Sequence, residues 1–411
     1  MIYLDHAAAT PVSEKVLEAM KPYFSDEFFN PSAAYLPAKK VAHNYETAKG
    51  VIAHAIGAKA SDLIITAGAT EANNLAFTAI LDGQISRSAP RPAGPSARAA
   101  GANSCAAALR NAPSQDICPV LYLSTEHDSV RRVAEQCGGQ EIDVLPNGLV
   151  NLDDLKAKIT DETELISISL ANNELGTIQP LAEVAAIIRE IKLDRLKRGV
   201  KTKLLLHSDA SQALNLLDIN VARLGIDLLT LNAAKIYGPK GVGALYVSHN
   251  AKLKPLTLGG GQENGLRSGT ENVAGVIGFA KAIELAKEHL NGNRKKYSTW
   301  RKALLAELQG YELINKKHSL DSFVVLCYNG IDAERLVFLL EEKGVYVATG
   351  AACAASKGVR SHVLKAIGLS DEQIAGSLRL TLGETNTEEQ VYEAAKIINT
   401  VVRQEQNRLK N

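Results

Sequence analysis

The sequence predicts an α/β protein, with a large domain built on a mostly parallel sheet and a smaller α+β domain. Between residues 63 and 247, short apolar runs alternate with helical patterns. The runs are continuously apolar instead of alternating with polar residues, which is typical of strands buried on both faces of a sheet. The predicted strands are Leu63–Thr66, Val120–Ser124, Ile142–Leu145, Leu165–Leu170, Leu204–Leu206, Leu228–Leu231 and Ala244–Val247.

The pattern changes at about Val276, where a long helix is predicted as far as Leu308, with Asn291-Gly292 as a point where it could break. A strand, a helix, two strands and a last helix with an apolar stripe are predicted after it. These elements are Phe323–Tyr328, Ala333–Lys343, Val345–Ala348, Leu378–Leu382 and Glu388–Leu409. We therefore assign residues 16–259 to the large domain, and residues 1–15 with 260–411 to the small one.

One segment of the large domain, about 86–119, differs from the rest in composition. It is rich in Ala, Ser, Pro, Gly and Arg and shows little hydrophobic periodicity. Such a segment can bury little apolar surface, so we expect an insertion at the surface.

The overall composition argues against several classes of protein. The 46 basic and 45 acidic side chains give a net charge of +1, which does not favour direct binding to nucleic acid or to an anionic membrane. No apolar run is long enough to span a bilayer, and the N-terminus lacks the order of a signal peptide. The cysteines have neither disulfide-like nor zinc-like spacing, so we expect a cytoplasmic protein without a metal site. They are Cys105, Cys118, Cys137, Cys327 and Cys353.

An acid and a lysine follow two successive predicted strands. Asp209 lies in the block that closes the predicted strand Leu204–Leu206, and Lys235 follows the predicted strand Leu228–Leu231. Because ligands bind at the carboxyl ends of parallel strands, we expect the two side chains to lie at one site. Singly, a helix cap and a surface lysine would be the commoner explanations. Together they suit pyridoxal 5'-phosphate, which needs a lysine amine and a carboxylate beside its pyridine nitrogen.

Two further segments suit the same site. Ala67-Gly68-Ala69-Thr70 joins a strand to a helix with small residues, which lets backbone N–H groups approach a phosphate, although an ordinary tight turn has the same pattern. Cys353 lies among small and polar residues after a predicted strand. An accessible thiol near cationic groups can ionise and act as a nucleophile, although a passive small residue is the alternative.

Short motifs along almost the whole chain resemble the cysteine desulfurases of the NifS/IscS type, in the class V aminotransferase branch of fold-type I pyridoxal-phosphate enzymes. In order, the motifs are Tyr3-Leu4-Asp5-His6-Ala7-Ala8, Gly68-Ala69-Thr70-Glu71, Thr125-Glu126-His127, Asn172-Asn173-Glu174-Leu175-Gly176, Asp209-Ala210-Ser211-Gln212, Lys235-Ile236-Tyr237-Gly238-Pro239-Lys240-Gly241, Arg267-Ser268-Gly269-Thr270-Glu271-Asn272, Gly350–Cys353 and Leu378-Arg379-Leu380-Thr381-Leu382-Gly383.

The resemblance implies a role for each matching residue around the cofactor. Lys235 forms the Schiff base and moves protons, and Asp209 pairs with the pyridinium nitrogen. Gln212 reaches the phenolic oxygen, and His127 lies on the ring face, where it can act as an acid or base. Ala69, Thr70 and Asn232 are placed at the phosphate. Thr270 is placed at the phosphate of the other subunit of a homodimer.

The resemblance also implies the reaction. Asn173 and Arg379 hold the carboxylate of L-cysteine, and Cys353 keeps the sulfur as a persulfide while alanine is released. An iron–sulfur scaffold protein or a sulfur carrier for tRNA thiolation then accepts the sulfur. A class V aminotransferase, a selenocysteine lyase, and a weakly active or non-catalytic partner of the sulfur-transfer machinery are the alternatives.

The chain departs from the family at the residues before Lys235, where a serine, a small residue and a histidine are usual. Here they are Asn232, Ala233 and Ala234, and an alanine side chain cannot donate to the phosphate. His6 replaces the usual asparagine of the first motif, and the sequence suggests no role for it.

We predict that this departure weakens retention of the cofactor. A hydrogen bond to a charged group contributes about 1.5–3 kcal/mol. The Ala234→His variant should therefore hold the cofactor about ten- to a hundredfold more tightly. Cofactor dissociation from the two purified proteins measures this, and equal dissociation constants would contradict it.

Overall fold

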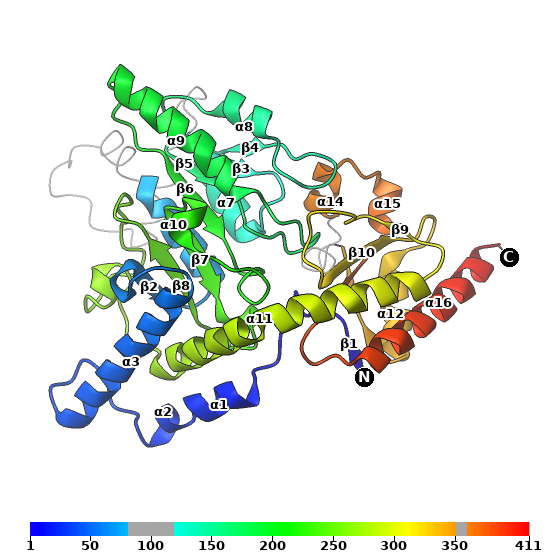
Figure 1. The fold of residues 1–411 in the computed structure, drawn as a ribbon, viewed down its shortest axis with the longest axis horizontal. Coiled ribbons are helices and arrows are strands. Elements are labelled where there is room, and N and C mark those ends of the chain that lie inside the picture. Colours follow the sequence, from blue (N-terminus) through cyan, green and yellow to red (C-terminus); the bar gives the residue numbers. More distant parts are fainter. Residues whose placement is uncertain (81–118, 351–359, 411) are drawn as a thin grey trace, which may run out of the picture.

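The computed structural model describes residues 1–80, 119–350 and 360–410. Its main feature is a seven-stranded sheet with the order β2-β8-β7-β6-β5-β3-β4 (Figure 1). β8 is antiparallel to both of its neighbours, and the pairs from β7 to β4 are parallel. The predicted α/β class is thus confirmed. The strands are β2 (Leu63–Thr66), β3 (Val120–Leu123), β4 (Gln140–Ile142), β5 (Leu165–Ser167), β6 (Leu205–Asp209), β7 (Leu228–Asn232) and β8 (Gly243–Val247).

Both faces of this sheet are covered by helices. Successive residues of a strand enter different hydrophobic clusters, as β2 illustrates: Leu63 and Ile65 belong to one and Ile64 to the other. Helices α4 (Ala69–Phe77) and α7 (Asp128–Gln136) supply residues to the second cluster. The first cluster takes residues from α3 (Leu36–Ala55), α9 (Leu181–Arg198) and α11 (Val273–Glu307). Burial on two sides explains why the strands are continuously apolar in sequence.

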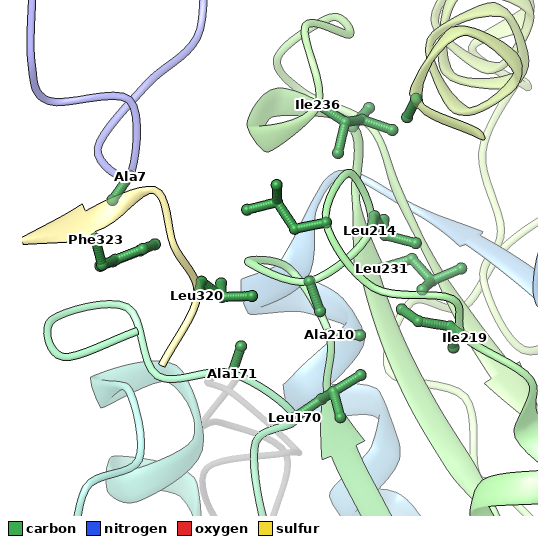
Figure 2. Packing of buried hydrophobic residues seen from close by; sticks show 14 of the residues in the cluster. Ala7, Leu170, Ala171, Ala210, Leu214, Ile219, Leu231, Ile236, Leu320 and Phe323 are labelled. Atoms are coloured by element: carbon green, nitrogen blue, oxygen red, sulfur yellow. The ribbon is translucent and has the colours of Figure 1, made fainter. Parts of the chain in front are cut away.

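The first cluster reaches the carboxyl ends of the strands. In Figure 2, Leu170 and Ala210 lie side by side just beyond β5 and β6, and Leu320 and Phe323 lie across from them. The ends of the strands are therefore fixed by packing from a distant part of the chain.

The C-terminal part contains a four-stranded antiparallel sheet with the order β12-β13-β10-β9. A separate parallel pair joins β1 to β11, so the first residues of the chain attach to this part. The strands are β1 (Ile2–Tyr3), β9 (Glu312–Leu313), β10 (Phe323–Cys327), β11 (Val345–Tyr346), β12 (Ala348–Thr349) and β13 (Ser377–Thr381).

One long helix connects the two parts. α11 packs on α1 and α3 and reaches α16 (Figure 1). Along the described chain, no helix is both long and apolar enough to cross a membrane. The other α-helices are α1 (Glu14–Met20), α2 (Pro22–Ser25), α3 (Leu36–Ala55), α8 (Leu152–Lys158), α9 (Leu181–Arg198), α10 (Val221–Leu224), α11 (Val273–Glu307), α12 (Ala333–Glu342), α14 (His362–Ala366), α15 (Asp371–Ala375) and α16 (Glu388–Lys410).

Four details of the sequence prediction were wrong. The strand expected at Leu165–Leu170 ends at Ser167, as β5. α11 continues without a break through Asn291-Gly292, because packing along its length outweighs the low helix propensity of one glycine. The strand expected at Val345–Ala348 is two strands, since Tyr346 pairs with the N-terminus and Ala348 pairs with Arg379. β4 ends at Ile142, where its pairing with β3 stops.

His6, for which the sequence suggested no role, holds the N-terminal segment against the end of β13. Its Nδ1 lies 3.0 Å from the Thr381 carbonyl oxygen, and its Nε2 lies 2.8 Å from the Thr385 hydroxyl. Burial lowers the pKa of His6, which favours the neutral ring. A Cβ added to Gly383 would lie 2.1 Å from this ring. The imidazole therefore fits only against a glycine.

We predict opposite stability effects for two glycine-to-alanine substitutions. Gly383→Ala should destabilise the protein by about 1–3 kcal/mol, because the added methyl group overpacks against His6. Gly292→Ala is the control: it lies inside α11, where an added Cβ meets nothing within 4 Å. It should stabilise by about 0.5–1 kcal/mol. Denaturant unfolding measures both, and a neutral Gly383→Ala would contradict the packing described here.

Candidate active site

A cavity of about 1100 Å³ opens at the carboxyl ends of the parallel strands. Its wall includes the beginning of α4 and Arg379 from β13, so the two parts of the protein enclose it together. Of the residues predicted for the site, Thr270 is exposed and is absent from this wall, and Cys353 lies outside the described residues. The cavity brings together Ala69, Thr70, His127, Asn173, Asp209, Gln212, Asn232, Lys235 and Arg379.

Asp209, the last residue of β6, presents a buried carboxylate to the cavity. Its Oδ2 accepts a hydrogen bond from Asn73 Nδ2 at 2.8 Å, and its Oδ1 accepts one from the Ser211 backbone N–H at 2.8 Å. One donor on each oxygen fixes the plane of the carboxylate. The group is thus oriented to accept a further N–H from a ligand.

Lys235 lies just after the end of β7, and β7 is the neighbour of β6 in the sheet. Its Nζ donates to the carbonyl oxygens of Ala7 and Ala8 at 2.8 and 2.5 Å, and Gln212 Nε2 donates to the Ala7 carbonyl at 3.0 Å. The N-terminal segment therefore holds the amine at the cavity wall. As the sequence predicted, adjacent strand ends place the amine and the Asp209 carboxylate on one cavity.

The beginning of α4 forms a pocket that an anion can enter. Gly68 precedes the helix with a φ of 144°, which a glycine adopts readily. A Cβ on Gly243 of β8 would lie 2.8 Å from the Gly68 Cα, so the two backbones approach closely because residue 243 is a glycine. Ala69 and Thr70 then face the cavity at the positive end of the helix. N–H groups in the first turn have no partner within the helix, and they suit a phosphate.

Arg379 lies in the middle of β13, with a side chain that is only 4% exposed. Its Nη2 lies 2.6 Å from Asp5 Oδ1, and its Nη1 donates to the Asn173 carbonyl at 2.9 Å. Its buried Nε has no hydrogen-bond partner among the described residues. A buried guanidinium with an unused donor can bind a carboxylate.

His127 caps α7 and is exposed to the cavity. Its Nδ1 lies 3.1 Å from the backbone N–H of Ser129 and 2.9 Å from the Ser129 hydroxyl. These contacts fix the orientation of the ring at the cavity wall.

The sequence analysis missed two acids of the wall, although both lie in the quoted motifs. Glu126 is completely buried, and its Oε1 accepts from the Ser169 backbone N–H at 2.5 Å. Burial and the nearby Asp209 raise the pKa of Glu126 to about 8. Desolvation raises the pKa of Glu174 to about 7, and its Oε2 accepts from the Ser361 hydroxyl at 2.5 Å. Their motifs could have drawn attention to them, but their burial follows only from the fold.

Comparison with known proteins identifies the family. The model of the family described as "Aminotransferase class-V" matches residues 2–87 and 98–393. The chain belongs to the class V aminotransferase family. It is 35% identical to cysteine desulfurase IscS 1 of Archaeoglobus fulgidus over 98% of this chain and 97% of that one. It is 36% identical to cysteine desulfurase IscS of Methanosarcina thermophila over 99% and 93% of the two chains.

Solved structures of class V aminotransferase relatives have the same fold. A NifS-like protein superposes with a TM-score of 0.83 at 28% identity, covering 98% of this chain and 99% of the other. A NifS-like protein of Rickettsia africae superposes with a TM-score of 0.80 at 26% identity, covering 98% of this chain and 99% of the other. The predicted fold-type I architecture is confirmed.

Enzymes of the class V aminotransferase family depend on pyridoxal phosphate, and the residues of this cavity fit that cofactor. An oriented carboxylate suits the pyridine nitrogen, a lysine amine suits the aldehyde, and the glycine-lined helix start suits the phosphate. The hydroxyls of Ser169 and Ser211 also line the cavity, buried and without a described hydrogen-bond partner. Polar atoms of this kind are expected where a polar ligand binds.

We predict that Glu126 makes the stability of the cofactor-free protein depend on pH. Unfolded, its carboxyl ionises near pH 4.5; folded, it ionises near 8. Between these values the folded state binds more protons, so the free energy of unfolding falls as pH rises, by at most about 1.4 kcal/mol per pH unit. Glu126→Gln should remove this contribution.

The measurement is urea unfolding of both proteins between pH 5 and 8. Glu174 titrates in a similar pH range in the wild type and in Glu126→Gln. The difference between their free energies of unfolding therefore isolates the contribution of Glu126. Parallel curves would show that Glu126 ionises in the folded protein as it does in the unfolded chain.

Proposed function

We propose that the chain is a pyridoxal-phosphate-dependent cysteine desulfurase, which converts L-cysteine to L-alanine and keeps the sulfur as a persulfide on Cys353. The observation that carries this proposal is one cavity containing the Asp209 carboxylate, the Lys235 amine and the buried guanidinium of Arg379. The names of the relatives support the choice of cysteine as the substrate.

The residues around the cofactor each have a defined task. Asp209 would accept the pyridine N–H and so keep the ring positively charged, and Gln212, which lines the same cavity, would reach the phenolic oxygen. The cofactor, when bound, supplies an electron sink for the carbon next to the amino group of the substrate. Lys235 Nζ would hold the cofactor through its aldehyde carbon and would accept the Cα proton of the substrate. His127, at the cavity wall, would serve as a second acid or base.

Different residues of the cavity would hold the substrate carboxylate and the cofactor phosphate. Arg379 would bind the substrate carboxylate through its planar guanidinium, together with Asn173. Ala69, Thr70 and Asn232 would bind the phosphate. These two charge-assisted attachments would orient the Cα–H bond toward Lys235.

Cys353 then receives the sulfur. Its thiolate attacks the sulfur of the bound substrate, an S–S bond forms, and the C–S bond breaks. The electron pair stays on carbon, which gains a proton on the way to alanine. The described residues on both sides of Cys353 adjoin the cavity, which supports this role: Ala348 pairs with Arg379, and Arg360 and Ser361 line the wall.

We propose further that the enzyme is a cytoplasmic homodimer that passes the persulfide to an iron–sulfur scaffold protein or to a sulfur carrier for tRNA thiolation. Thr270 is exposed and away from the cavity of its own chain, as a residue that reaches the phosphate of the partner subunit must be. Large apolar side chains around α1, α2 and the start of α3 are also exposed, and a second copy would cover them. They are Leu17, Phe24, Phe28, Tyr35 and Leu36.

We predict that sulfide and alanine release from L-cysteine in the presence of a reductant requires both Lys235 and Cys353. Lys235→Ala should lower the rate by a factor on the order of 100 or more, because the proton-transfer group is lost. Cys353→Ala should abolish persulfide formation. Cys137→Ala is the control, because that thiol is buried and its pKa is raised to about 12, so it does not ionise at neutral pH.

Other results would identify the alternatives. A class V aminotransferase would accumulate pyridoxamine phosphate and would not need Cys353. A selenocysteine lyase would prefer selenocysteine when the two substrates are compared. A non-catalytic partner would lack the absorbance band of cofactor bound covalently to Lys235, a band that Lys235→Ala would remove from the enzyme.

A further inference from the structure

A chain of hydrogen bonds behind the cavity connects Asp209 to His127. Asn73 of α4 is completely buried, and its Nδ2 lies 2.8 Å from Asp209 Oδ2 and 2.8 Å from the Ser129 hydroxyl oxygen. That hydroxyl lies 2.9 Å from His127 Nδ1. Asn73 itself is not part of the cavity wall. It therefore contacts two wall residues, Asp209 and Ser129, from behind.

The chemistry of the four groups fixes the direction of each hydrogen bond. A carboxylate only accepts, so the amide nitrogen of Asn73 faces Asp209 and donates to it. The second amide hydrogen is donated to the Ser129 oxygen, which leaves the hydroxyl hydrogen of Ser129 for His127 Nδ1. The Ser129 backbone N–H also points at this Nδ1, from 3.1 Å, and it can only donate. Nδ1 is thus an acceptor, and the neutral imidazole carries its proton on Nε2.

Helix packing does not explain an asparagine at this position. Its neighbours on α4, Ala72, Leu75 and Ala76, are buried apolar residues. The Asn73 Oδ1 is buried without a hydrogen-bond partner among the described residues, which is unfavourable. What the amide provides, and an apolar side chain would not, is two donors pointing at two different acceptors.

We propose that Asn73 is a positioning residue that couples the acid at the pyridine nitrogen to the imidazole on the ring face and holds the His127 proton on Nε2. The proposal rests on the roles of Asp209 and His127 in the proposed function. In this arrangement His127 exchanges protons with the bound substrate through Nε2 alone, while the same amide aligns Asp209 with the ring nitrogen.

The first test is the tautomer of His127 in the cofactor-free protein. Nitrogen-15 NMR of histidine-labelled protein distinguishes a protonated ring nitrogen from an unprotonated one. The His127→Gln variant assigns the signal among the nine histidines. We expect an unprotonated Nδ1 and a protonated Nε2. A proton on Nδ1 would overturn the proposal.

The second test is a double-mutant cycle between Asn73 and Ser129, read as the dissociation constant of pyridoxal phosphate. The Lys235→Ala background makes binding reversible, because the covalent bond cannot form. Asn73→Ala and Ser129→Ala should each weaken binding, Asn73→Ala by about ten- to a hundredfold. Since both break one bridge, the double variant should be little weaker than the worse single variant. If the fold-changes in dissociation constant of the two single variants simply multiplied in the double variant, the proposal would be overturned.

Two controls separate the bridge from a general effect on α4. Asn74 lies beside Asn73, and its side chain donates to the Thr70 carbonyl at 2.8 Å and not to Asp209 or Ser129, so the effects of Asn74→Ala and Ser129→Ala should multiply. Asn73→Asp keeps the size of the side chain but cannot donate while ionised. It should weaken binding at least as much as Asn73→Ala, and wild-type affinity for Asn73→Asp would contradict the bridge. Neither test uses turnover of cysteine, so failure of the bridge and failure of the desulfurase proposal are distinguishable.

Discussion

The arrangement of the cavity depends on keeping one buried carboxylate, Asp209, available for a ligand. A buried charge is unfavourable unless it is hydrogen-bonded and paired. Asn73 and the Ser211 backbone N–H supply the hydrogen bonds. The neighbouring Glu126 stays protonated at neutral pH, so this part of the wall does not carry two adjacent negative charges. A protonated pyridine ring would provide the compensating positive charge, so this carboxylate suits a cofactor whose ring nitrogen carries a proton.

The second constraint is the N-terminal segment, which contacts both parts of the protein within a few residues. Asp5 pairs with Arg379, His6 contacts Thr381 at the end of β13, and the next two carbonyl groups accept from Lys235. The same short piece of chain thus sets the position of the guanidinium relative to the amine. Because Asp5 already pairs with Arg379, a substrate carboxylate bound there, as we propose, would share the guanidinium with Asp5. The Nε of Arg379 is buried without a hydrogen-bond partner among the described residues.

The sequence predicted what local pattern and strand order determine. Continuous apolar runs identified the strands of the main sheet, and adjacent strand ends placed Asp209 and Lys235 on one cavity. Contacts between distant segments could not be predicted in this way. Asn73 reaches Asp209 across 136 positions, and the burial that raises the pKa of Glu126 appears only when the strands are assembled. For Cys353 and the segment about 86–119, the predictions rest on the sequence, since Cys353 and residues 81–118 lie outside the described parts.

The departure before Lys235 can now be interpreted in physical terms. Asn232 Oδ1 accepts from the Ala234 backbone N–H at 3.1 Å, and the Ala234 carbonyl accepts from the Thr10 hydroxyl at 3.1 Å. The turn that presents Lys235 is therefore held by a side-chain cap and a backbone contact, and it does not need a histidine. What Ala234 removes is one donor at the phosphate. In the proposed homodimer, the N–H groups at the start of α4, the Thr70 hydroxyl and a Thr270 side chain from the other subunit would compensate for it. If so, affinity for the cofactor should depend more on dimer formation here than in relatives that have the histidine.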